Sequence, residues 1–314
     1  MKKIFTLLLV LNAAAIFAQP IEDSVLLSTA SGILKGSLFV PAGKTSFPVL
    51  ILIPGSGPTD RYGNNPMGVK ANSYKMMATT LSSKNTGVLL FDKRGIAGSR
   101  PAAGSEADLR FETYVNDVVE WIQWLQKDKR VRSIFIAGHS EGSLIGILAA
   151  QKIKVQGFIS IAGPAKGIAE IITGQYAAQL PKAAVIVDSL FKRLQNNQPL
   201  DTVPQYLMSI FRPSIQPYMK SWIKYIPCNE LKKLTIPVLI IQGTTDLQVD
   251  PAQASLLKQC SKNALLVLLD SMNHILKDAP ANRAQNMATY ANPTLPLSAG
   301  LMPAIAAFIQ KNNH

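Results

Sequence analysis

The segment Gly138-His139-Ser140-Glu141-Gly142 joins two apolar runs, and this arrangement restricts the fold more than any other feature of the chain. Residues 133–137 are typical of a short buried strand, and residues 143–150 are typical of the first turns of a buried helix. A strand that turns sharply into a helix holds the residue at the turn in a strained conformation with an exposed side chain, and flanking glycines relieve the crowding. The pattern therefore predicts that Ser140 is an exposed nucleophile. The alternative is an ordinary glycine-rich turn.

Strand-like and helix-like segments alternate along most of the chain. The first two strands predict an antiparallel hairpin, and the later ones are apolar runs of the kind that is buried on both faces of a parallel sheet. Helices between such strands predict an α/β fold with a mostly parallel sheet flanked by helices. Eight strands are expected, at residues 24–30, 33–40, 48–53, 87–91, 133–137, 155–162, 237–241 and 264–269, and other core helices at 74–84, 111–127 and 299–310.

The alternation stops after the sixth expected strand. The next stretch contains helical segments separated by prolines, with no apolar run suited to a buried strand. We interpret residues 165–234 as a helical insertion that overhangs Ser140 as a cap, with part of its apolar surface lining an acyl pocket. A helical embellishment away from the site is the alternative. The expected helices are residues 169–179, 183–195, 203–211 and 217–225.

The N-terminus has the features of an export signal. Two lysines precede an apolar stretch, residues 4–17, which is too short to span a bilayer comfortably, and Ala18 is a small residue at a cleavage point. We therefore expect residues 1–18 to be a removed signal peptide. Residues 19–314 would then form a periplasmic or secreted domain without a membrane span.

Composition narrows the possible partners. The net charge is +13, but the basic residues are scattered, and their densest group, residues 127–132, is more typical of a solvated helix end than of a nucleic-acid site. Cys228 and Cys260 are the only cysteines, and either a disulfide or two buried thiols would account for them. Neither lies near a Cys-x-x-Cys motif or a histidine cluster, so no metal site is expected. Nothing in the sequence indicates an oligomeric state.

A serine hydroxyl becomes an effective nucleophile when a positioned base takes its proton. The chain has three histidines. His139 adjoins Ser140 and is expected to point away from the hydroxyl, and His314 is the last residue. This leaves His274, in a loop directly after the last expected strand, where such a sheet presents catalytic groups. A structural loop histidine is the alternative.

The base in turn needs a carboxylate to orient it and to stabilise the imidazolium. Asp246 follows the seventh expected strand across a short turn and produces the chain order Ser, Asp, His. Asp250 precedes a proline and is typical of a helix N-cap, and Asp270 is better placed to hold the histidine loop. We predict that Ser140, Asp246 and His274 are the catalytic residues.

A tetrahedral oxyanion needs two preorganised N–H donors. The backbone N–H of Glu141, at the start of the helix, is one. The second is expected in the loop after the third strand, where glycines on both sides of Ser56 allow its N–H to turn inward, and Gly57 is the alternative. The loop could also be a simple tight turn. It is not expected to cradle a phosphate, because no Gly-Lys-Ser/Thr follows.

Three motifs together resemble the α/β-hydrolase superfamily over essentially the whole chain after the signal. They are the elbow around Ser140, the loop Pro54-Gly55-Ser56-Gly57-Pro58-Thr59-Asp60-Arg61, and the segment Phe91-Asp92-Lys93-Arg94-Gly95-Ile96-Ala97-Gly98-Ser99. The last is similar to the family's Asp-x-Arg-Gly-x-Gly-x-Ser turn, with Ala97 inserted before Gly98. The loop is more narrowly similar to that of bacterial esterases of the esterase D and dienelactone-hydrolase-like groups, whose cores resemble S9 and S33 serine peptidases.

The resemblance implies a carboxylic ester hydrolase that acts on a small-molecule ester without a cofactor. Two departures stand out: Pro54 replaces the histidine usual before the oxyanion glycine, and Ser140 stands where dienelactone hydrolases proper have cysteine. The leading hypothesis is an exported serine carboxylesterase. An S33-like aminopeptidase or an amidase is the alternative, with Glu141 or an acid of the insertion receiving the substrate's ammonium. A non-catalytic binding protein on the same fold typically lacks a triad member, and here all three are present.

Overall fold

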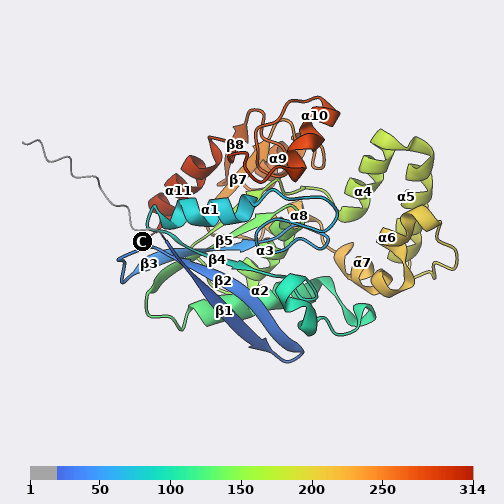
Figure 1. The fold of residues 1–314 in the computed structure, drawn as a ribbon. Coiled ribbons are helices and arrows are strands. Elements are labelled where there is room, and N and C mark those ends of the chain that lie inside the picture. The colour runs from blue at the N-terminus through green and yellow to red at the C-terminus, as the bar shows by residue number, and fades with distance from the viewer. Residues whose placement is uncertain (1–19, 314) are drawn as a thin grey trace, which may run out of the picture.

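An eight-stranded sheet forms the centre of the structure, a computed structural model that describes residues 20–313 (Figure 1). The strand order is β1-β2-β4-β3-β5-β6-β7-β8. The hairpin of β1 and β2 is antiparallel, β2 also runs antiparallel to β4, and every pairing from β4 to β8 is parallel. The predicted fold class is confirmed. The strands are β1 Ile21–Thr29, β2 Gly32–Val40, β3 Phe47–Ile53, β4 Gly87–Phe91, β5 Val131–His139, β6 Gly157–Ile161, β7 Val238–Gly243 and β8 Leu265–Leu269.

Strand β3 shows why the central strands are apolar at every position. Val49 and Ile51 belong to the apolar cluster on one face of the sheet, and Leu50 and Leu52 belong to the cluster on the other. Successive side chains of a strand point to opposite faces, so a strand between two layers of helices must be apolar on both. All four side chains are fully buried.

Helices cover both faces of this sheet. α1 (Ser73–Ser82) and α11 (Leu301–Asn312) pack together on one face, and α2 (Phe111–Leu125), α3 (Glu141–Lys152) and α9 (Ala252–Cys260) lie on the other (Figure 1). The sequence analysis indicated only the start of α9, at Asp250, and did not identify α10 (Arg283–Ala288), because both helices are short and their apolar spacing covers little more than two turns.

Five helices follow β6 and precede β7: α4 Ile168–Gln179, α5 Pro181–Gln195, α6 Met208–Phe211, α7 Gln216–Trp222 and α8 Pro227–Leu231. In Figure 1, α4 to α7 stand beside the sheet in yellow-green to orange, whereas α8 packs on α3 and α9 of the core. The insertion therefore lies where the sequence places it. Its role as a cap stays a prediction.

Aromatic side chains join the insertion to the core. The ring of Phe111, the first residue of α2, stacks on the ring of Trp222 in α7 with centroids 5.2 Å apart. The backbone N–H of Phe111 donates to Ser221 Oγ at 2.7 Å. This hydrogen bond satisfies one of the N–H groups that the first turn of a helix leaves without an intrahelical partner. The insertion thus docks on the N-terminus of α2.

A disulfide joins Cys228 in α8 to Cys260 at the end of α9, with the two Cα atoms 5.5 Å apart. Of the two possibilities that the sequence left open, the structure has the bonded pair. The expected signal peptide, residues 1–18, lies outside the described residues. Within the described range, no helix has both the length and the apolar character needed to cross a bilayer.

Candidate active site

Ser140 occupies the turn between β5 and α3 in a strained backbone conformation, with φ 55° and ψ −119°. The turn is possible only because its neighbours are small. A Cβ on Gly138 would lie 2.1 Å from the carbonyl oxygen of Gly142, and a Cβ on Gly142 would lie 2.4 Å from the carbonyl oxygen of Ile53. The local geometry is thus the strained strand-to-helix turn that the sequence predicts.

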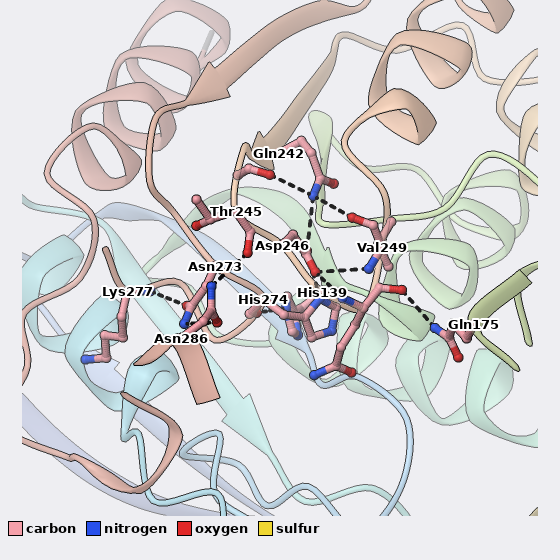
Figure 2. Close-up of polar contacts among 12 residues, drawn as sticks. His139, Gln175, Gln242, Thr245, Asp246, Val249, Asn273, His274, Lys277 and Asn286 are labelled. Atoms are coloured by element: carbon pink, nitrogen blue, oxygen red, sulfur yellow. Dashed lines mark hydrogen bonds and ion pairs between the residues drawn. The ribbon is translucent and has the colours of Figure 1, made fainter. Parts of the chain in front are cut away.

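His274 and Asp246 meet across the loops that follow β8 and β7. His274 Nδ1 lies 2.9 Å from Asp246 Oδ2, and both side chains are buried. The other carboxylate oxygen, Oδ1, accepts the backbone N–H groups of Gln248 at 2.8 Å and Val249 at 3.0 Å. Gln242 Nε2 donates to Oδ2 at 3.1 Å (Figure 2). The carboxylate is therefore held in one orientation against the imidazole.

These contacts also determine the protonation of the pair. Burial alone would raise the pKa of Asp246, but the neighbouring His274 and the hydrogen bonds from Val249 and Gln248 outweigh it and lower that pKa below its ordinary value. An ionised carboxylate only accepts hydrogen bonds, so His274 carries its proton on Nδ1. Its Nε2 is left as the basic atom, which is the tautomer that a general base for a serine needs.

The rival carboxylates have other roles. Asp250 Oδ1 accepts the N–H of Ala252, the first residue of α9, at 2.8 Å, from one position before the N-cap, which is Pro251. The expectation that Asp270 holds the histidine loop is wrong. The neighbouring Ser271 holds it instead, through hydrogen bonds of 3.0 Å to Thr244 Oγ1 and 2.8 Å from Thr245 Oγ1, because its backbone groups face the β7 loop.

Ser140 and His274 line the same cavity, which has a volume of about 300 Å³. Its walls come from residues 55–74 and from the segments around Ile275 and Tyr290. Residues 165–234 contribute no side chain to this lining, although Gln175 of α4 donates to the carbonyl oxygen of the lining residue Gln248 at 2.8 Å. Contact of the insertion with an acyl pocket stays a prediction. None of the described residues that line it is Asp, Glu, Lys or Arg. A larger hollow, about 730 Å³ beside α7, contains no residue of the predicted triad.

The predicted oxyanion donors lie at this cavity. Ser56 and Gly57 both line it, and a Cβ on the preceding Gly55 would be 3.3 Å from Ser140 Cβ. The N–H of Ser56 finds no acceptor within residues 20–313. Glu141 begins α3, and the first N–H groups of a helix have no intrahelical acceptor. One such N–H belongs to a residue that lines the cavity, and the other belongs to the residue after Ser140, so their role as an oxyanion hole stays a prediction.

Comparison with known proteins supports this architecture. The serine aminopeptidase family S33 matches residues 66–209. The esterase EstD of Thermotoga maritima is 28% identical over 253 residues, which cover 77% of this chain. The chain spans 58% of the length of that relative.

Solved structures share the fold over nearly the whole chain. Est1E from Butyrivibrio proteoclasticus has a TM-score of 0.58 at 17% identity, covering 92% of this chain and 98% of its own. A dienelactone hydrolase from Anabaena variabilis has a TM-score of 0.56 at 17% identity, covering 94% and 99%. XC6422 from Xanthomonas campestris, described as an α/β serine hydrolase without a lid, has a TM-score of 0.53 at 17% identity, covering 92% and 94%. The chain has the α/β-hydrolase fold.

His139 has a structural role at the candidate site that the sequence did not reveal. It is buried, its ring centroid lies 4.7 Å from that of His274, and its Nε2 donates to the His274 carbonyl oxygen at 2.8 Å. Since a carbonyl only accepts, Nδ1 carries the lone pair and accepts the hydroxyl of Tyr74 at 2.7 Å. Burial lowers the pKa of His139 to about 3, which keeps the ring neutral. His139 thus supports the backbone of the predicted base.

Side-chain amides link the loops of the candidate site (Figure 2). Asn273 Nδ2 donates to Asn286 Oδ1 at 3.2 Å and to Thr289 Oγ1 at 2.8 Å. Asn286 Nδ2 donates to the Thr245 carbonyl oxygen at 2.9 Å. The position of Asn273 beside His274 is the only sequence signal for this network, because its partners are distant in the chain.

The turn after β4 binds Arg61, at the end of the loop that contains Ser56. Asp92 accepts the backbone N–H of Arg61 at 2.8 Å and its guanidinium at 2.8 Å and 3.1 Å. Ala97 has φ 41°, in the left-handed region that favours glycine. Asp92 and Ser99 have the spacing of the family motif, so Ala97 replaces the motif's second glycine. The interpretation of Ala97 as an insertion is wrong.

Proposed function

We propose that this α/β hydrolase is an exported serine carboxylesterase that cleaves small, uncharged esters through an acyl-enzyme. The observation that carries the proposal is the paired His274 and Asp246 at the cavity into which the strained turn places Ser140. The three residues come from loops after three different strands, and the Asp–His hydrogen bond provides the tautomer that a general base needs.

In the proposed reaction, Ser140 Oγ attacks the acyl carbonyl carbon while His274 Nε2 takes the hydroxyl proton. Asp246 stabilises the imidazolium, and the N–H groups of Ser56 and Glu141 stabilise the oxyanion. Collapse of the tetrahedral species breaks the ester bond, and the proton on His274 leaves with the alcohol. Water then repeats the sequence on the acyl-enzyme and releases the acid and Ser140.

The cavity supports an uncharged substrate. A volume of about 300 Å³ is at the lower end of the range for small-molecule sites. Its lining combines apolar side chains, such as Val69 and Met287, with neutral polar ones, such as Asn65 and Gln248. A charged substrate group would lose its hydration there without gaining an opposite charge. Short acyl chains on neutral alcohols satisfy these conditions.

The match to the S33 family makes an aminopeptidase the second candidate. An aminopeptidase needs a carboxylate for the substrate's ammonium. Glu141, the residue that could supply it, is buried and already engaged, with Oε2 3.0 Å from Lys93 Nζ and Oε1 accepting the hydroxyl of Tyr218. These contacts favour ester over aminoacyl substrates.

The disulfide between Cys228 and Cys260 supports export, because such bonds persist in oxidising compartments. The basic and apolar character of residues 1–18 points to the same compartment. Expression of the full chain in a bacterial host and fractionation test this part. We expect mature protein that begins near Gln19 outside the cytoplasm, and full-length protein confined to the cytoplasm would contradict export.

Substrate profiling tests the activity. Purified mature protein is assayed with p-nitrophenyl esters of graded acyl length and, in parallel, with aminoacyl arylamides. We expect kcat/KM to be highest for short acyl esters and at least 100-fold lower for every arylamide. Faster turnover of the arylamides would favour the aminopeptidase. No turnover of any ester would count against the esterase proposal.

A further inference from the structure

Lys93 is a buried cation to which the proposed chemistry assigns no role. It lies in the turn after β4, and only 3% of its side chain is exposed. Its Nζ donates to the carbonyl oxygen of Gly55 at 2.6 Å and to Glu141 Oε2 at 3.0 Å. Lys93 does not line the cavity. Of its two partners, Gly55 precedes Ser56, a predicted oxyanion donor, and Glu141 follows Ser140.

The contact with Gly55 determines where the next N–H points. The peptide between Gly55 and Ser56 is trans. In a trans peptide the carbonyl of one residue and the N–H of the next point in opposite directions. Because Lys93 holds the Gly55 carbonyl on its own side, the N–H of Ser56 is directed to the opposite side, away from Lys93. That N–H has no acceptor in the described chain, and Ser56 lines the cavity of Ser140.

The loop needs such a restraint. Glycines precede and follow Ser56, and glycine allows a peptide to flip at low cost. A flipped peptide would point the Gly55 carbonyl toward the site and replace a donor to the oxyanion with a group that repels it. The preceding N–H, that of Gly55, is held only by a long 3.4 Å hydrogen bond to Tyr74. The ammonium makes the shorter, charge-assisted contact, which resists the flip more strongly.

The ammonium is itself held in place by Glu141, which Tyr218 holds in turn. Glu141, whose backbone N–H is the other predicted donor, binds Lys93 through Oε2 and Tyr218 through Oε1. Burial raises the pKa of Tyr218 well above its ordinary value, so its hydroxyl stays protonated and donates. Tyr218 belongs to α7, and three buried side chains therefore connect the insertion to the loop after β3.

We propose that Lys93 is a positioning residue for the oxyanion hole, held by Glu141, and that Tyr218 links the insertion to it. Lys93 fixes the peptide that presents the Ser56 N–H, while Glu141 supplies the second donor from its own backbone. The inference rests on the proposed hydrolase function, since it concerns the hole used in that reaction.

The test is Lys93→Met, which keeps the length of the side chain and removes its donor. Loss of one oxyanion donor lowers kcat by about 10²–10³-fold in other serine hydrolases. We expect a loss of this order in ester hydrolysis, with KM within about threefold of the wild-type value. Affinity for phenylboronic acid, which forms a tetrahedral adduct with the serine, should fall in parallel. The midpoint of the pH profile of kcat/KM should not move, because the His274–Asp246 pair is unaffected.

Asp117→Asn is the matched control. This change disturbs the buried ion pair between Asp117 and Arg94. Arg94 follows Lys93 in the sequence, but the pair makes no hydrogen bond to the loop of Gly55 and Ser56. We expect its kcat and boronic acid affinity to stay within about threefold of wild type. If Lys93→Met does not fold because Glu141 is left unpaired, Lys93→Met combined with Glu141→Gln removes both charges and serves in its place.

The outcomes separate the two proposals. If the wild-type protein neither cleaves esters nor binds phenylboronic acid, the proposed function fails and this inference fails with it. If the wild type does both, and the Lys93 variant behaves like the Asp117 variant, only the positioning role is wrong. Tyr218→Phe should lower kcat about threefold to tenfold, and an unchanged kcat would remove the insertion from the proposal.

Discussion

The carboxyl edge of the sheet and the insertion are held together by different kinds of contact. At the edge, the predicted catalytic side chains are oriented by directional hydrogen bonds, such as those that converge on Asp246. In the insertion, large apolar side chains such as Phe191 and Phe211 pack on each other, with ring centroids 4.8 Å apart. Directional contacts fix the geometry of a reaction, whereas apolar packing mainly supplies stability. Substitutions in the two regions should therefore have different consequences.

The largest effect is expected at the edge of the sheet, from Ser140→Ala. Loss of the nucleophile should lower kcat for esters by about 10⁴-fold or more and abolish labelling by a fluorophosphonate probe, with the free energy of unfolding nearly unchanged. The exposed Ser83, directly after α1, provides the matched control: Ser83→Ala should retain full activity and labelling. Labelling that persists in the Ser140 variant would assign the nucleophile to another residue.

Asp246→Asn should have the second largest effect, again through geometry rather than stability. An amide in place of the carboxylate no longer stabilises the imidazolium and favours the wrong tautomer of His274, so kcat should fall by about 10³–10⁴-fold. Asp250→Asn should change kcat little and cost a fraction of a kcal/mol, because the asparagine oxygen can also accept the N–H of Ala252. Steady-state kinetics and urea unfolding of both variants test the assignment. The reverse ranking would show that Asp250 orients His274.

Acyl selectivity distinguishes the two regions most directly. Met287 lines the cavity, and Met287→Ala should raise kcat/KM for hexanoate relative to acetate esters about threefold to tenfold by enlarging it. Phe191→Ala, inside the insertion, should lower the free energy of unfolding by about 3–5 kcal/mol but leave this ratio unchanged. A change of the ratio in the Phe191 variant would show that the insertion shapes the pocket in solution.

The smallest effect concerns pH and the buried His139. Its pKa is lowered from 6.5 to about 3 in the folded state, so below pH 6.5 the unfolded chain binds a proton that the folded chain does not. The free energy of unfolding should therefore fall as the pH falls from 6.5, by at most about 1.4 kcal/mol per pH unit from this residue. His139→Gln, which cannot titrate there, should show a shallower slope in urea unfolding between pH 7.5 and 4.5. Equal slopes would contradict a neutral, buried His139.

Much of the fold follows from patterns that act over a few residues. Apolar runs predicted strands β3 to β7, because strands buried on both faces of a sheet need apolar side chains at nearly every position. The edge strands β1 and β8 are only partly buried. Helix α10 was missed, and only the start of α9 was indicated, because such short segments depend on what they pack against rather than on their own periodicity.

The candidate triad could also be predicted from the sequence, because the glycines around Ser140 indicated the nucleophile and only three histidines were available as the base. Tertiary structure alone decided the rest. Three hydrogen bonds form only when the sheet brings its loops to one edge. They join Lys93 to Gly55, His139 to Tyr74, and Asn273 to Asn286. Apolar side chains of the insertion, some of which the sequence assigned to an acyl pocket, pack on one another and on the start of α2. A hydrophobic pattern states that a side chain must be buried, and only the packed fold determines what buries it.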